Sequence, residues 1–191
     1  MISTGRVTVK PEEFKLVEFD RAEIVAVIER LLDAIGLDRP VVLDVDQTTP
    51  LGATSVESVD PIVIHAQSGA LEDPRRLRQL SPSGAAQNLG RLLIRVADRL
   101  DPAFTAGGEP PADSKLTLLQ HEAWDTYALG RLVRLGFTHH ADRQSALYRF
   151  RTRHGFTDGA DERFDALWRG SGLTWGDIDR LSAEAAAVTA A

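Results

Sequence analysis

The sequence contains no cysteine, which excludes disulfide bonds, thiolate nucleophiles, iron–sulfur clusters and cysteine-ligated zinc. Any bound metal would need His, Asp or Glu ligands. No stretch approaches the roughly 18 consecutive apolar residues that a membrane span requires. The first ten residues also lack the apolar run of a signal peptide, so we expect a cytoplasmic protein without a membrane partner.

Positive charge is scarce as well. The chain has 22 basic against 28 acidic residues, which gives a net charge of −6. Nucleic-acid binders normally carry a strongly positive face, so we expect no nucleic-acid partner. Only three of the basic residues are lysines, and the alanine-rich, arginine-rich balance is typical of a high-GC bacterial genome.

What the sequence does contain is enough for a folded core. Its 191 residues are 43% apolar and 26% charged, values close to those of globular proteins. We predict a single compact domain over residues 1–191, with an α+β half at 1–104 and a helical half at 113–185. Residues 105–114, with two glycines and two prolines, have the composition of a linker.

Hydrophobic periodicity predicts strands first and helices later. Asp20 is placed to cap a helix that runs to Ile35 and ends at Gly36. In the first half we expect one or two short strands within 6–19, strands at 41–46 and 61–65, a loop or irregular edge at 47–58, and a surface turn or short helix at 71–80. In the rest we expect helices at 81–100, 115–135, 142–153 and 161–168, a short helix capped by Thr174, and a frayed end at 185–191. The predicted fold class is α+β: a small N-terminal β-sheet with covering helices and a C-terminal helical layer.

One candidate site lies in the predicted helix 115–135. His121 and Asp125 are four residues apart, so their side chains share one helix face, as ligands of one metal ion must. Glu122 projects about 100° away, where a general base could reach a metal-bound water. The favoured interpretation is a structural polar cluster in which Glu122 pairs with an arginine. The alternative is a metal-dependent hydrolase that binds zinc or another divalent metal.

A second candidate is the sequence Gln87-Asn88-Leu89-Gly90-Arg91 in the predicted helix 81–100. The order of helix, strand, strand, polar turn and helix around it resembles the front half of small bacterial proteins with the zincin metallopeptidase fold. In that fold the helix carries HExxH, often as HELGH. The resemblance covers at most residues 20–100.

The resemblance implies a metallopeptidase site that lacks its zinc ligands and its general base. Gln87 and Arg91 stand where the two zinc-binding histidines would be, and Asn88 stands where the glutamate base would be. Arginine offers no lone pair, glutamine is a poor zinc ligand, and an amide takes no proton from water. The third-ligand position of the long zincin motif falls at Ala97. We therefore expect a degenerate, zincin-like scaffold.

Two weaker sequence patterns are also candidates for a functional site. Residues 44–48, Asp-Val-Asp-Gln-Thr, follow an apolar strand and resemble the DxDxT motif of haloacid dehalogenase phosphatases, but the helical second half lacks that family's later strands. Arg149 and Arg153 share a helix face that could bind phosphate or a partner's carboxylates. The favoured interpretation of these arginines is a basic face that pairs with the acidic residues 158–165.

The sequence thus predicts a non-catalytic cytoplasmic protein without a cofactor, which acts on an unidentified protein partner. The metal-dependent hydrolase, with His121 and Asp125 as ligands and Glu122 as base, is the alternative.

Overall fold

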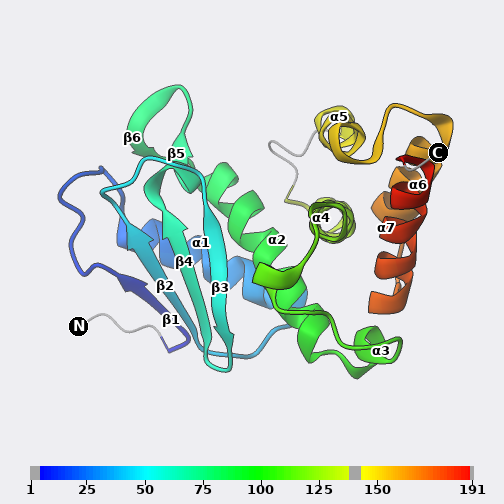
Figure 1. Cartoon of the computed structure of the whole chain (residues 1–191). Coiled ribbons are helices and arrows are strands. Elements are labelled where there is room, and N and C mark those ends of the chain that lie inside the picture. Colours follow the sequence, from blue (N-terminus) through cyan, green and yellow to red (C-terminus); the bar gives the residue numbers. More distant parts are fainter. Residues whose placement is uncertain (1–4, 138–142, 190–191) are drawn as a thin grey trace. The chain divides into compact units, whose positions relative to one another are not determined.

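The computed structural model describes residues 5–137 and 143–189 (Figure 1). Its contacts divide the chain into two compact units, Met1–Val96 and Ala97–Ala191. The first unit contains every strand of the described chain, and the second is helical. This arrangement confirms the α+β fold class. The expectation of one single domain stays a prediction.

The first unit is built on a mixed four-stranded sheet with the order β1-β2-β4-β3. The strands are β1 (Val7–Lys10), β2 (Val41–Asp46), β3 (Thr54–Val59) and β4 (Ile62–Gln67). Strands β1, β2 and β4 are parallel, and β3 is antiparallel to β4 at the edge. Because parallel strands end at the same edge of a sheet, the polar residues at the ends of β2 and β4 lie next to each other.

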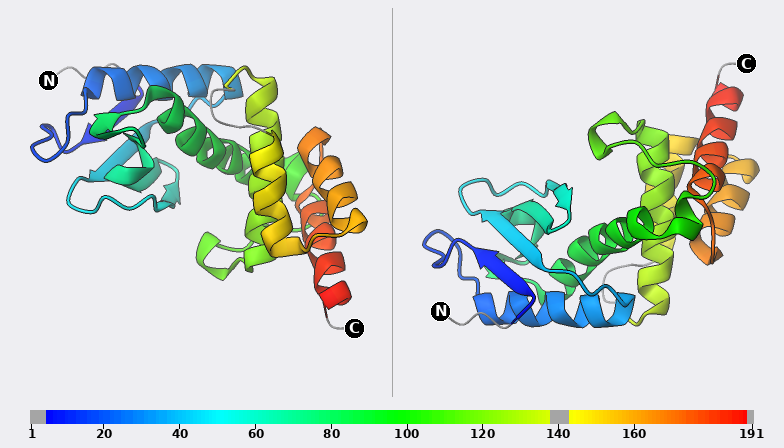
Figure 2. Two further views of the ribbon diagram at one scale, coloured as in Figure 1. Left: turned by 90° about the horizontal axis from the view of Figure 1, so that it is seen from above. Right: turned by 90° about the horizontal axis from the view of Figure 1, so that it is seen from below.

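One face of this sheet is apolar and the other polar. Side chains alternate along each strand, so Leu43 and Ile64 are buried whereas Asp46 and His65 are exposed. Helix α1 (Arg21–Ile35) runs along one side of the sheet (Figure 2) and buries its own apolar stripe. As predicted, Asp20 caps α1 by accepting the Ala22 N–H.

One prediction in this unit is confirmed in part and another is wrong. Residues 47–58 were expected to be a loop or an irregular edge, and 54–59 form the bulged edge strand β3, whose half-buried Thr-Ser-Val-Glu-Ser-Val sequence lacks a continuous apolar run. Residues 71–80 were expected to be a turn or short helix, but they contain the hairpin of β5 (Glu72–Asp73) and β6 (Arg76–Leu80). The arginines of this hairpin are exposed, so backbone pairing rather than hydrophobic burial defines it.

Helix α2 (Pro82–Leu100) follows the β5–β6 hairpin, and a short 3₁₀ turn (Ser68–Ala70) lies between β4 and that hairpin. Ser81 caps the helix, since its hydroxyl accepts the Gly84 N–H at 3.1 Å. The apolar face of α2 is buried at Ala85, Leu89 and Leu93. Half-buried positions beside this apolar face are occupied by Gln87, Asn88 and Arg91.

The second unit is organised around helix α4 (Leu118–Arg134), which contacts α5 (Arg143–His154), α6 (Asp158–Arg169) and α7 (Trp175–Thr189). Every residue from Glu122 to Gly130 is buried, which confirms that α4 is a central helix. It begins at Leu118 rather than at residue 115, because Thr117 and Gln120 form a capping box. The expected start of the next helix, Asp142, lies outside the described residues.

The predicted linker is held by hydrogen bonds. Before it lies a short helix, α3 (Pro102–Thr105), and at its end a 3₁₀ turn, Asp113–Lys115. The Arg99 guanidinium donates to the carbonyl oxygens of Pro110 and Pro111 at 3.1 and 2.8 Å, and to the Asp113 carboxylate at 2.6 Å. Within the described part of the chain, no helix combines the length and apolar character that crossing a membrane requires.

Candidate functional site

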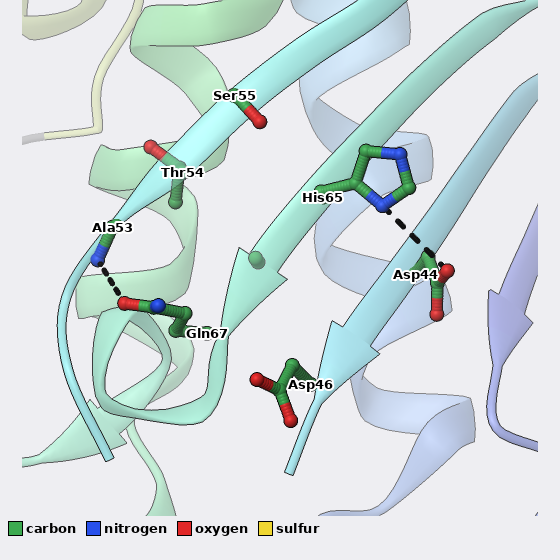
Figure 3. Close-up of a pocket in the computed structure, with 8 residues that line it drawn as sticks. Asp44, Asp46, Ala53, Thr54, Ser55, His65 and Gln67 are labelled. Atoms are coloured by element: carbon green, nitrogen blue, oxygen red, sulfur yellow. Dashed lines mark hydrogen bonds and ion pairs between the residues drawn. The ribbon is translucent and has the colours of Figure 1, made fainter. Parts of the chain in front are cut away.

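The polar face of the N-terminal sheet carries a pocket of about 330 Å³ (Figure 3). It lies over the carboxyl-terminal halves of β2 and β4, the end of parallel strands where ligand crevices form in open α/β sheets. Strand β3 supplies one wall and β2 the other. The lining residues are Asp44, Asp46, Ala53, Thr54, Ser55, His65, Ala66 and Gln67.

Two carboxylates enter the pocket from β2. Asp44 and Asp46 are two residues apart on one strand, so both side chains lie on the same face of the sheet. The Asp46 carboxylate accepts hydrogen bonds from the hydroxyl and the N–H of Thr48, at 2.6 and 2.9 Å. Hydrogen bonds from Thr48, and then from Thr49, lower the pKa of Asp46 below its usual value, so this wall keeps its negative charge.

His65 lies between two carboxylates on the same face. It stands opposite Asp44 in the register of β2 and β4, and its Nδ1 atom is 3.6 Å from the Asp44 carboxylate. Its Nε2 atom is 2.7 Å from the Glu57 carboxylate. Glu57 is the extra residue of a bulge in β3, where the pairing with β4 shifts between Val56 and Ser58. Four residues from three strands therefore form one polar cluster: Asp44, Asp46, Glu57 and His65.

The residues at the zincin positions of α2 are half-buried, and Asn88 takes part in the structure of the first unit. Its side-chain amide donates to the carbonyl oxygen of Ala70 at 2.7 Å. This bond ties the middle of α2 to the 3₁₀ turn that follows β4. Gln87 and Arg91 lie on either side of Asn88 along the helix. None of the three lines the described pocket.

The structure brings the α4 residues together as their spacing predicts. His121 Nδ1 lies 3.4 Å from the Asp125 carboxylate, with His121 about half exposed and Asp125 buried. Glu122 points elsewhere: its nearly buried carboxylate accepts Nε–H of Arg149 from α5 at 3.0 Å. Across the described residues, no group of three or more His, Asp or Glu side chains is placed to hold a metal ion.

The arginine patch is largely paired within the second unit. Arg149 bonds to Glu122, whereas Arg153 is exposed near the end of α5. Three other arginines between residues 126 and 156 pair with acidic residues: Arg131 with Asp98, Arg143 with Asp165, and Arg151 with Asp161. Arg134 donates instead to the carbonyl oxygens of Trp168 and Gly170. The expected pairing with residues 158–165 therefore holds for Arg143 and Arg151 of α5, whereas Arg149 pairs with Glu122 instead.

One buried histidine has no role in either cluster. His154, at the end of α5, is buried and stacks on Phe150 with ring centroids 3.9 Å apart. Burial, followed by the nearby charge of Arg163, lowers the pKa of His154 to about 4. In the unfolded chain a histidine binds a proton below about pH 6.5. Between pH 6.5 and pH 4, His154 therefore binds a proton in the unfolded chain but not in the folded protein.

We expect acidification from pH 7.5 to 5 to reduce the free energy of unfolding by about 2 kcal/mol through His154 alone. The loss begins near pH 6.5 and levels off below pH 4. Urea unfolding of the wild type and of His154→Leu at a series of pH values measures it. His154→Leu should lose this slope, while His121→Gln, at a half-exposed position, should keep it. An unchanged slope in His154→Leu contradicts the prediction.

Comparison with known proteins adds no relative. A scan of protein-family models, a search of curated proteins and a search of solved structures each found no match to this chain.

Sequence reasoning named Asp44 and Asp46 as part of a weak motif but did not connect them with His65. A signal was present, because carboxylates at the end of one buried strand and a histidine at the end of another predict neighbours in a parallel sheet. The contribution of Glu57 had no such signal, since it depends on a bulge.

Proposed function

We propose that this chain is a non-catalytic cytoplasmic domain that acts by binding a partner, with a degenerate zincin-like scaffold in its N-terminal unit. The observation that carries this proposal is the hydrogen bond from the Asn88 amide to the Ala70 carbonyl oxygen. An ionised carboxylate has no proton to donate, so a glutamate reaching the same oxygen would set two acceptors against each other. The position of the zincin base is therefore suited to an amide.

Two other features support the proposal. Between α1 and α2 the chain has strands followed by a polar hairpin, as the zincin resemblance expects, with β3 as one strand more than that order contains. Gln87 and Arg91, at the positions of the zinc-binding histidines, are poor metal ligands. An open polar pocket on the sheet offers a place for a binding role without chemistry at α2.

The metal-dependent hydrolase remains the alternative because His121 and Asp125 do lie together on α4. The least supported element of this alternative is its general base, Glu122. Glu122 is held by Arg149, so it would have to break an ion pair before it took a proton from water. We therefore favour a structural role in the second unit for His121, Glu122 and Asp125.

Metal analysis separates the two functions. Protein purified without chelator or nickel resin is expected to contain no stoichiometric zinc or other divalent metal, as measured by plasma mass spectrometry. Stoichiometric metal that is lost in His121→Ala and kept in the control His65→Ala would contradict the proposal and support the hydrolase. The same samples, tested for hydrolysis of a peptide mixture, are expected to show no activity above the buffer.

A further inference from the structure

The turn of the β5–β6 hairpin is an exposed basic surface. Residues 74–78, Pro-Arg-Arg-Leu-Arg, are exposed one after another, and Leu77 among them is 81% exposed. Figure 1 shows this hairpin projecting beyond the end of the four-stranded sheet. Packing of the core therefore does not explain the sequence of this turn.

The two acids of the hairpin are engaged with other groups. Glu72 accepts the Ser68 hydroxyl at 2.7 Å and the backbone N–H of Arg78 at 3.1 Å. Asp73 accepts the backbone N–H of Arg75 at 2.8 Å. Within the described residues, three guanidinium groups have neither a hydrogen bond nor an ion pair: those of Arg75, Arg76 and Arg78. These groups are available to an external anion.

The backbone that carries these arginines is fixed. Arg78 has a φ of 65°, a left-handed conformation that residues other than glycine rarely adopt. Its N–H is held by Glu72, and its carbonyl oxygen accepts the N–H of Glu18 at 2.7 Å. Strained conformations of this kind persist where the surroundings fix them, and they are frequent at ligand-binding sites. A surface that is ordered in advance also loses less conformational entropy when a partner binds.

An apolar patch adjoins the arginines. Glu18 and Gln79 form a parallel β-bridge, so Leu16 and Leu77 occupy corresponding positions two residues earlier on the two segments. Their exposed fractions are 50% and 81%. Arginine is enriched in protein–protein interfaces, and two exposed leucines beside it give a partner apolar area to bury.

We propose that the β5–β6 hairpin is the docking surface for an acidic segment of a partner protein. The carboxylates of this segment pair with Arg75, Arg76 and Arg78, and an apolar side chain between them packs on Leu77. The inference rests on the binding role proposed above and names the surface and the chemistry of the partner. A guanidinium group suits this task because it binds a carboxylate through two parallel N–H donors.

The charge of the hairpin favours an acidic peptide over a polyanion. Residues 72–78 contain three arginines and two acids, a local net charge of +1, on a chain with a net charge of −6. Binding to nucleic acids and to anionic membranes depends on many basic residues acting together, about four to eight in membrane-binding clusters. A peptide needs only short-range pairing with individual guanidinium groups, and its apolar side chain can cover Leu77.

The test is a titration of the full chain, followed by the chemical shifts of its backbone amides. The probe is the blocked peptide Asp-Glu-Leu-Glu-Asp, and we expect a dissociation constant on the order of 1 mM, with shifts at residues 72–80. The same peptide with Asn and Gln in place of its acids is expected to bind about tenfold more weakly. With Ser in place of its Leu, the loss is expected to be about threefold.

Two further probes represent the other classes of partner. These are a short oligouridylate and vesicles of phosphatidylglycerol, each titrated at the same ionic strength as the peptide. Stronger binding of either one at the hairpin would overturn the proposal in favour of a nucleic acid or a membrane surface.

Variants of the hairpin locate the contacts. Arg75→Gln, Arg76→Gln and Leu77→Ser are each expected to weaken binding of the acidic peptide about threefold. Arg78→Gly should do the same, because glycine adopts the left-handed conformation freely and only the guanidinium is lost. This variant separates the loss of charge from any disturbance of the hairpin backbone.

Two matched substitutions outside the hairpin are the controls. Arg30→Gln, at an exposed position of α1, changes the net charge equally. Leu118→Ser removes a leucine that is 67% exposed in the second unit. Both should leave binding unchanged. Equal weakening in the controls, equal binding of the uncharged peptide, or shifts confined to other elements would overturn the proposal.

This outcome is separable from that of the proposed function. Failure of the acidic peptide to bind removes the docking surface but leaves a non-catalytic binding domain. Stoichiometric, His121-dependent metal removes the non-catalytic function whether or not the hairpin binds an acidic peptide.

Discussion

Asp98→Ala is expected to lower the free energy of unfolding by about 3 kcal/mol, because it removes the buried carboxylate at the centre of the second unit. Asp98 is 3% exposed; it accepts the indole N–H of Trp124 at 2.9 Å and pairs with Arg131. Without it, both donors lose their acceptor, and the Arg131 charge is left with partial access to water. Urea unfolding followed by far-ultraviolet circular dichroism measures the change.

The charge state of Asp98 shows why this carboxylate depends on its partners. Burial raises its pKa above the usual range, while Arg131 and the Trp124 N–H act in the opposite direction. Asp98→Asn keeps an oxygen that can accept the Trp124 N–H, so we expect a smaller loss than in Asp98→Ala. In a double-mutant cycle, Asp98→Ala with Arg131→Met should cost less than the sum of the single changes. Additive losses would show that Asp98 and Arg131 contribute to stability independently of each other.

Gly130→Ala is expected to destabilise the chain by about 2–3 kcal/mol, the upper part of the range of roughly 1–3 kcal/mol that is usual for overpacking, although alanine is the better helix former. A Cβ atom at Gly130 would lie 2.2 Å from the carbonyl oxygen of Trp168, which is backbone and cannot rotate away. Helices α4 and α6 would have to separate. Arg134, which donates to the same oxygen at 2.6 Å, would shift with them.

A second helical glycine provides the control for this substitution. At Gly159, near the start of α6, the nearest atom to an added Cβ is the flexible end of Arg163 at 3.6 Å. Gly159→Ala should therefore be neutral or stabilising by up to about 1 kcal/mol. Thermal unfolding of the two variants side by side tests the packing argument, which fails if Gly130→Ala is as stable as Gly159→Ala.

The starts of α1 and α7 were predictable because capping is local chemistry, whereas α6 begins at Asp158 rather than at residue 161, and α7 continues to Thr189 through the expected fray. Asp20 caps α1, and Gly36 ends it in the left-handed conformation at φ 77°. At α7, the Thr174 hydroxyl and the Asp177 carboxylate bond to each other's backbone N–H, as their three-residue spacing predicts. The buried α4 was also evident, since it is apolar on most of its circumference.

Strand β3 and the pocket depend on contacts between distant residues, which a single sequence does not display. The apolar content of β3 is too low for the period of a buried strand, and it is defined by pairing with β4. Asp44 and His65 are 21 residues apart and become neighbours only through the register of β2 and β4. The spacing within α4, by contrast, predicted the His121–Asp125 contact because both residues lie on one helix.

The distribution of large aromatic rings has a practical consequence. All three tryptophans, Trp124, Trp168 and Trp175, belong to the unit Ala97–Ala191, and Trp124 packs against Trp175 with ring centroids 5.3 Å apart. Intrinsic indole emission therefore reports on the second unit alone. A tryptophan introduced by Val63→Trp on β4 would add an indole to the N-terminal sheet, and the difference between the melting curves of this variant and the wild type would follow that unit in the intact chain.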